Sequence, residues 1–89
     1  MNNQDLLRAA HQHSIFNKDE ILESQVCGCF YCLKNFAPQQ ITEWVEEGDN
    51  RHETALCPFC SIDSVIGNKS GYKVDDKNFL KTMYDYFFA

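Results

Sequence analysis

The sequence predicts one small α+β domain whose hydrophobic core is too small to stabilise it without cross-links or a bound metal. The chain has 89 residues, of which 44% are hydrophobic and 13% aromatic, and it contains five cysteines. A chain of this length folds as a single domain, and so small a core usually needs disulfides or a metal as a staple. The hydrophobic and aromatic content excludes a wholly disordered chain.

Charge and cysteine usage narrow the class of protein further. The chain carries 8 basic and 13 acidic residues, for a formal net charge of -5. This balance argues against a general nucleic-acid binder, because such binding depends on neutralising phosphates with Lys and Arg. The sequence shows neither a signal peptide nor an apolar run that could span a membrane, so we expect a cytoplasmic protein. In a reducing compartment, closely spaced cysteines more often bind metal or do redox chemistry than form disulfides.

The N-terminal part of the chain, residues 1–25, is predicted to be helical. Residues 3–13 have high helix propensity, and their apolar residues fall on one side. Asn17 and Glu20 have the spacing of a capping box, which predicts a second, short helix that ends near Ser24.

The middle part, residues 26–67, is predicted to contain a β-hairpin followed by a helix. Residues 41–57 are rich in β-branched and aromatic residues and carry a turn signal at 47–50. Pro58 is typical of the first residue of a helix and Gly67 of its end. Between them, Ile62, Val65 and Ile66 have helical spacing.

The last part, residues 68–89, is predicted to be a loop and a C-terminal helix. Asp75 or Asp76 is expected to cap this helix. Its apolar stripe consists of Phe79, Leu80, Met83, Tyr84 and Phe87. We expect this stripe to pack on the middle part and to supply the core that it lacks. Tyr86 and Phe88 fall outside the stripe, so an exposed aromatic face could form a homodimer or bind a protein partner.

Two Cys-x-x-Cys pairs, Cys29 with Cys32 and Cys57 with Cys60, predict a metal site. Four cysteine thiolates form a closed tetrahedral site, and zinc is the usual ion for such a set. We therefore expect one Zn²⁺ per chain in a structural role. Redox-active dithiols are the alternative, but a thioredoxin-like motif needs a βαβ context that the chain lacks.

The order of knuckle, hairpin and helix around this site is that of a treble-clef zinc finger. Cys60 would then lie in the first turn of the helix, where the helix dipole favours a thiolate. A zinc ribbon is the competing interpretation. In a ribbon, a glycine commonly follows the second cysteine of a knuckle, whereas here Ser61 follows Cys60.

Cys27 is the fifth cysteine and is left over by this assignment. Gly28 makes the segment pliable, so Cys27 could replace Cys29 as a ligand. A small buried hydrophobe is the more common role of an extra cysteine. A reactive thiol beside the metal is the third alternative.

The segments Cys27-Gly28-Cys29-Phe30-Tyr31-Cys32, Ile41-Thr42-Glu43-Trp44 and Thr54 to Gly67 contain most of these features. In these segments the chain resembles a family of small uncharacterised bacterial proteins, over a span from about His11 to the C-terminus. Members of that family have glycine where Ser61 stands. The resemblance implies a bacterial, cytoplasmic zinc protein and gives no activity, substrate or partner.

The histidines suggest two further sites, a second metal site and a nuclease site, but the sequence supports neither well. His11 and His13 are two residues apart, so on a helix they face different directions and would chelate a metal poorly. His52 in the hairpin invites comparison with HNH nucleases, which are also built on treble clefs. The chain has no His-Asn-His pattern, however, and a four-cysteine zinc has no open position for a catalytic water.

Two further residues are candidates near the metal. Asp63 would support the ligands from the start of the predicted helix, with Ser64 beside it. Trp44 is expected to pack over the zinc knuckle, and a partly exposed tryptophan would mark a contact with a protein.

The sequence thus predicts a non-enzymatic zinc protein that acts as an adaptor or regulator through protein contacts. A nucleic-acid-associated finger or degenerate nuclease is the first alternative. It would need the eight Lys and Arg residues gathered on one face, notably Lys69, Lys73, Lys77 and Lys81. A thiol redox sensor is the second alternative.

Overall fold

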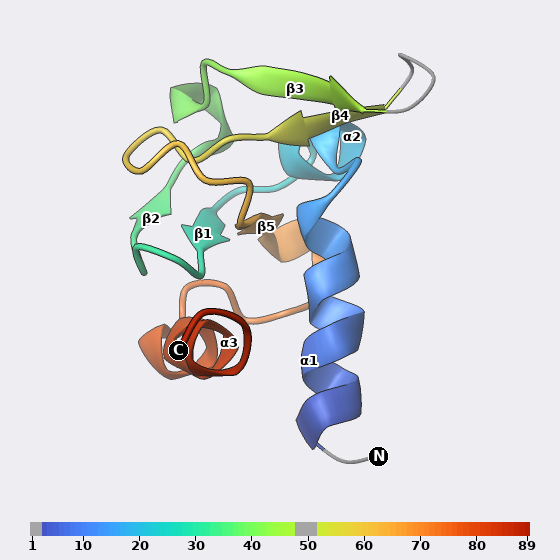
Figure 1. Ribbon diagram of the computed structural model, residues 1–89. Helices are drawn as coiled ribbons and strands as arrows, with labels where there is room; N and C mark the ends of the chain where they lie inside the picture. Colours follow the sequence, from blue (N-terminus) through green and yellow to red (C-terminus); the bar gives the residue numbers. More distant parts are fainter. Residues whose placement is uncertain (1–2, 48–51) are drawn as a thin grey trace.

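The computed structural model describes residues 3–47 and 52–89 and shows a small α+β protein (Figure 1). Its helices are α1 (Asn3–His11), α2 (Lys18–Leu22) and α3 (Lys77–Phe87), with the 3₁₀ turns η1 (Gln12–Ser14), η2 (Pro38–Gln40) and η3 (Asn68–Ser70). Its strands are β1 (Cys27–Cys29), β2 (Asn35–Phe36), β3 (Trp44–Glu47), β4 (His52–Ala55) and β5 (Val65–Gly67). No helix in the described part of the chain has the length and apolarity needed to cross a membrane.

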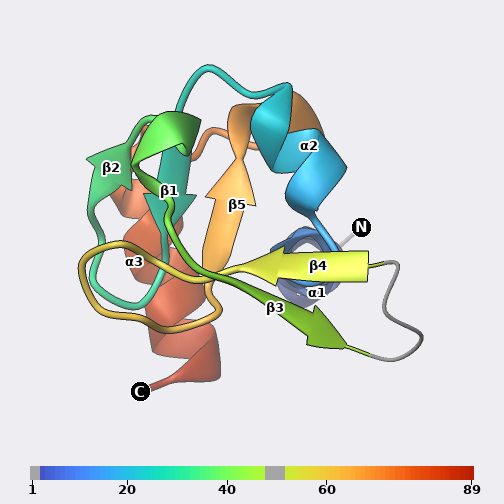
Figure 2. The ribbon, with the colours of Figure 1, turned by 90° about the horizontal axis from the view of Figure 1, so that it is seen from above.

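The strands form two small sheets that lie in separate layers. One has the antiparallel order β2-β1-β5, with Cys29 opposite Val65. The other is the predicted hairpin β3-β4, in which Trp44 pairs with Ala55. Residues 48–50 of the predicted turn lie outside the described residues. Figure 2 shows the hairpin running across the direction of the three-stranded sheet, while α3 lies on the opposite side of that sheet in Figure 1.

The prediction of a helix between Pro58 and Gly67 is wrong, because no helix forms there. All of these residues are described, and they form a turn, a short loop and β5. Val65 and Ile66 are both fully buried, because β5 is covered on both faces by the rest of the protein. A strand that is buried on both faces has consecutive apolar residues, here Val65 and Ile66. Together with Ile62 they also fit the spacing of one face of a helix, which led to the wrong prediction. The treble clef is therefore not confirmed, since the helix that should carry its last ligand is missing from 58–67.

The core consists of two clusters on the two sides of the three-stranded sheet. The cluster on the hairpin side contains Ile21, Cys27, Cys29, Phe36, Ile41, Ala55, Cys57 and Val65. The cluster on the α3 side contains Leu7, Ala10, Phe30, Ile66, Val74, Leu80 and Met83. β1 lies close to the chain before α3. A Cβ atom at Gly28 would stand only 2.5 Å from the backbone oxygen of Val74, so this approach requires glycine.

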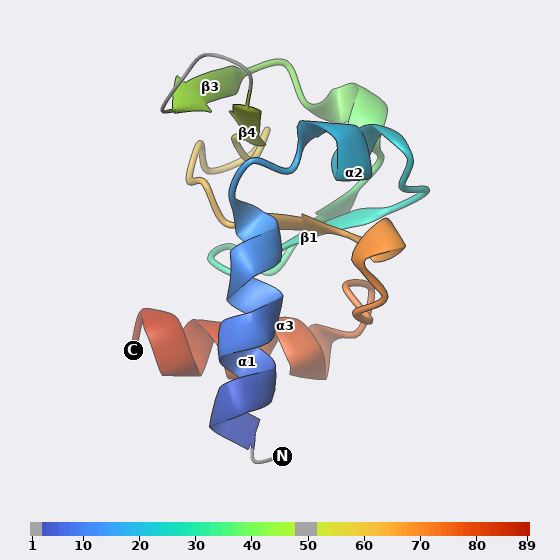
Figure 3. The same ribbon diagram turned by 90° about the vertical axis from the view of Figure 1, so that its right-hand side faces the viewer.

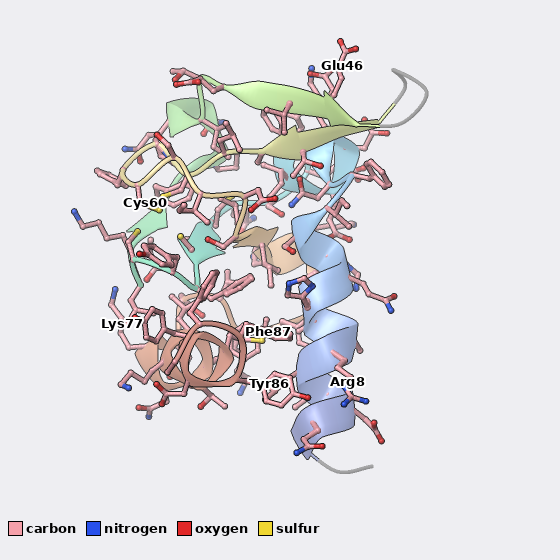
Figure 4. The ribbon with its side chains drawn as sticks, viewed as in Figure 1. Arg8, Glu46, Cys60, Lys77, Tyr86 and Phe87 are labelled. Carbon is pink, nitrogen blue, oxygen red and sulfur yellow. The ribbon has the colours of Figure 1, made fainter. Side chains whose placement is uncertain are left out.

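The C-terminal helix largely follows its prediction. The Asp76 side chain accepts a 2.8 Å hydrogen bond from the amide of Asn78 and so caps α3. Figure 3 shows α1 crossing α3, and Arg8 Nε donates to the Tyr86 hydroxyl at 3.2 Å where the two helices meet (Figure 4). Tyr86 is thus half-buried instead of exposed. Phe88 remains 42% exposed and packs edge-on against Tyr31.

Asn17 precedes α2 but does not cap it. Its side chain makes no capping hydrogen bond and is buried. Its amide nitrogen donates to the carbonyls of His13 and Val65, and its amide oxygen accepts from the amide of Ala55. One side chain thereby joins the N-terminal segment to β5 and β4.

Candidate metal centre

The four predicted ligands lie in two turns with the same backbone hydrogen bonds. In the first turn, Cys29 N–H donates to Lys34 O at 3.1 Å and Leu33 N–H donates to Cys29 O at 2.8 Å. In the second turn, Cys57 N–H donates to Ile62 O at 3.0 Å and Ser61 N–H donates to Cys57 O at 2.9 Å. The two Cys-x-x-Cys segments are therefore two copies of one structure, a knuckle.

In each knuckle, the residue after the second cysteine has a left-handed backbone conformation with positive φ. Leu33 and Ser61, which directly follow the second cysteine of each pair, both have φ 65°. This conformation favours glycine, and for a bulky residue such as leucine it is a clear outlier. Ser61 thus occupies the turn position at which a zinc ribbon commonly has glycine, and the chain adopts the turn without it.

The knuckles bring four sulfurs together in a group that fits one metal ion. The Sγ atoms of Cys29, Cys32, Cys57 and Cys60 all lie within 4.8 Å of one another. The pairs Cys29–Cys60 and Cys32–Cys57 are each 3.6 Å apart. A tetrahedral site with Zn–S bonds of about 2.3 Å would place its sulfurs about 3.8 Å apart. The observed spacing is close to this value.

Backbone amides are directed at the sulfurs of both knuckles. Tyr31 N–H and Phe59 N–H each point at the first cysteine of their knuckle, with N···Sγ distances of 3.4 Å to Cys29 and Cys57. The amides of Cys32 and Cys60 point at the same two sulfurs. Such donors offset the negative charge of a thiolate, which is the form that binds metal.

Ser64 adds a side-chain hydroxyl to this environment. It is 1% exposed, and its Oγ lies 3.0 Å from Cys29 Sγ. Its carbonyl also accepts the amide of Phe30 at 3.0 Å, which ties β5 to the first knuckle. Once Cys29 is a metal-bound thiolate, the hydroxyl can only donate to it. The predicted supporting residue, Asp63, is instead exposed, because the helix on which that prediction depended does not form.

Burial sets the acidity of most of the thiols in the metal-free group. It raises the pKa of Cys29, Cys32 and Cys60 to about 11, although hydrogen bonds from nearby amides oppose the shift. Burial acts in the same direction on Cys57. There, hydrogen bonds from Phe59, Cys60 and the thiols of Cys32 and Cys60 prevail, so the pKa of Cys57 is lowered.

Cys27 lies outside the sulfur group. It is fully buried in β1, and burial raises its pKa to about 12. The structure therefore gives it the role of a small core residue and not that of a ligand in place of Cys29. Trp44 is half-buried and packs against the core cluster on the hairpin side, and Lys18 Nζ lies 5.3 Å from the centre of its ring.

The histidines do not join this site in the described residues. The His11 ring packs against Phe87 at 4.3 Å, and His13 Nδ1 lies 2.9 Å from Glu20 Oε1. His52 begins β4, and its side chain is outside the described part of the structure. In that described part, the four cysteines form the metal-compatible group.

The lysines of the C-terminal part are mostly engaged by the protein itself. Lys77 donates to the carbonyl of Leu33, and Lys81 Nζ lies 2.8 Å from Asp85. Lys69 lies 4.0 Å from Glu23, and Lys73 is exposed.

No protein-family model, curated protein or solved structure matches this chain. The interpretation of the site therefore depends on its own geometry. In particular, it depends on the repeated knuckle and on the four sulfurs that the knuckles bring together.

Proposed function

We propose that the protein is a structural zinc protein in which Cys29, Cys32, Cys57 and Cys60 hold one Zn²⁺. The observation that carries this proposal is the pair of knuckles with matching hydrogen bonds, whose four sulfurs have the spacing of a tetrahedral site. Four thiolates favour zinc over harder cations, which prefer oxygen ligands. The paired knuckles also favour a ribbon-like arrangement over the treble clef.

A structural role follows from the composition of the site. Four protein ligands leave no open position for water or substrate, so the metal would stabilise the fold and not take part in a reaction. Two of the proposed ligands, Cys29 and Cys57, belong to the core, since they are 0% and 2% exposed. The metal would thus complete the cluster on the hairpin side.

The biological role is proposed as that of an adaptor or regulator, without enzyme activity, that acts through protein contacts. Exposed aromatic side chains support this role, because such residues often anchor protein interfaces. They are Tyr31, Phe59 and Phe88, each at least 42% exposed. Contacts of Tyr31 and Phe88 with each other place part of this surface at the C-terminal end of α3, where a homodimer could also form.

The setting is proposed to be the bacterial cytoplasm, as the resemblance in sequence implies. All five cysteines are free in the structure, which suits a reducing compartment.

Metal analysis of the purified protein tests the proposal. We expect about one zinc per chain, and Co²⁺ substitution should give the absorption bands of a tetrahedral thiolate site. Cys57→Ser should weaken metal binding strongly. Cys27→Ala is the matched control, because it also removes a buried cysteine of the same cluster but leaves the sulfur group intact. Metal-free protein with a folded core, or equal loss of metal in both variants, would contradict the proposal.

A further inference from the structure

The four sulfurs of the proposed site differ in their access to solvent. Cys29 and Cys57, the first cysteine of each knuckle, are 0% and 2% exposed. Cys32 and Cys60, the second of each knuckle, are half-buried. A reagent from solvent therefore meets Cys32 and Cys60 before it meets the other two ligands.

The first cysteine of each knuckle also receives more hydrogen bonds at its sulfur than the second. Cys29 receives two amides and the Ser64 hydroxyl, and Cys57 receives two amides. For Cys32 the backbone donor among the main influences is the amide of Lys34, and for Cys60 it is that of Ile62, so each has one such amide where Cys29 and Cys57 have two. Each donor withdraws negative charge from a thiolate and lowers its nucleophilicity. The second cysteine of each knuckle is thus the more nucleophilic as well as the more exposed.

A surface cavity distinguishes Cys32 from Cys60. Cys32 lines an open cavity of about 300 Å³ between the first knuckle and α3, together with Tyr31, Leu33, Lys81 and Tyr84. A cavity of this size admits a peroxide molecule. Lys81 belongs to the lining itself, and Lys77 (labelled in Figure 4) donates to the carbonyl of Leu33, another lining residue. The cavity thus combines access to a thiolate with positive charge close by.

We propose that Cys32 is the point at which a small hydroperoxide, such as hydrogen peroxide, attacks the metal centre and releases its metal. This inference rests on the proposed zinc site. The Cys32 thiolate attacks one peroxide oxygen and forms an S–O bond as the O–O bond breaks. The departing hydroxide takes a proton from water or from a nearby lysine, and Cys32 becomes a sulfenic acid.

Cys57 completes the reaction. Its Sγ lies 3.6 Å from that of Cys32, so its thiolate can attack the sulfenic sulfur, form an S–S bond and expel hydroxide. Overall, two thiolates, one hydrogen peroxide and two protons give one disulfide and two waters, so the sulfurs are oxidised and the peroxide is reduced. Only Cys29 and Cys60 then remain as ligands, and two thiolates hold zinc far more weakly than four.

The test uses metal-loaded protein, with its zinc content measured before any oxidant is added. Limiting hydrogen peroxide is followed by acid quenching, peptide mapping and detection of released zinc with a chromogenic chelator. Cys32 should be oxidised about tenfold faster than Cys29, because it has fewer donors and more exposure. The disulfide should join Cys32 to Cys57, with one zinc released per disulfide formed.

A pair of surface variants tests the cavity without removing a ligand. Lys81→Trp places a large side chain in the cavity and should slow zinc release severalfold, whereas Lys73→Trp, on an exposed loop position outside it, should leave the rate unchanged. Oxidation that begins at Cys60 or Cys29, or equal rates of zinc release in the two variants, would overturn this inference and leave the proposed zinc site intact. Protein that carries no zinc at the outset would remove the proposed function and this inference together.

Discussion

Replacement of Ser64 by alanine should weaken metal binding without unfolding the protein. The Ser64 hydroxyl is 1% exposed and lies 3.0 Å from Cys29 Sγ, so water cannot replace the hydrogen bond once the hydroxyl is removed. Hydrogen bonds to charged groups are worth about 1.5–3 kcal/mol. At 25 °C this corresponds to a loss of about 10- to 150-fold in zinc affinity. Supporting hydrogen bonds around metal ligands commonly have effects of about 10- to 100-fold.

A competition titration against a chromophoric chelator measures this loss. Ser14→Ala is the matched control, because Ser14 is also a buried serine whose hydroxyl donates to a backbone carbonyl, that of His11, at 2.6 Å. Both variants should lower the free energy of unfolding, but Ser64→Ala should lower the zinc affinity about tenfold or more beyond Ser14→Ala. The reasoning is refuted if Ser64→Ala binds zinc within twofold of the unchanged protein, or if Ser14→Ala loses as much affinity.

Two further predictions concern the acidity of the ligands and the strained turns. Burial holds the pKa of three ligand thiols near 11, and these thiols must lose their protons to bind metal, so affinity should rise with pH. A fall from pH 7 to pH 6 should weaken zinc binding about a thousandfold or more, because at least the three protons of these thiols must be displaced. Chelator competition that gave the same affinity at both pH values would count against this. At Ser61, where φ is 65°, glycine should be tolerated, while the β-branched valine should be less stable than glycine by about 1–2 kcal/mol. Thermal unfolding of Ser61→Gly and Ser61→Val measures this difference, and equal stability would show that the turn is not strained.

The metal-compatible group of four cysteines was predictable because its pattern lies in two short segments of the sequence. A Cys-x-x-Cys pair closes its own turn, so each pair indicates a knuckle whatever surrounds it. The hairpin and α3 also depend on local patterns, namely β-branched residues around a turn and an apolar stripe after the capping residue Asp76. These elements agree with the prediction apart from their exact ends.

The errors have a different origin. The turn after Cys60 has no glycine at its left-handed position, so the usual signal of a knuckle was missing and the helical spacing of Ile62, Val65 and Ile66 prevailed. Burial of β5 on both faces depends on packing that no local pattern records. Ser64 lies 35 residues from Cys29 in the chain, so the link between them is visible only in three dimensions.

Asn17 also bears on how much of the chain is needed for the metal centre to form. A peptide that began at the first knuckle would contain all four ligands, yet it would lack the side chain that satisfies the Ala55 amide and the Val65 carbonyl. Both groups lie in segments that adjoin the second knuckle, and both are buried. The smallest unit that can be excised as a working metal module therefore extends upstream past α2, well before the first ligand. The cysteines mark the centre of this module and not its edges.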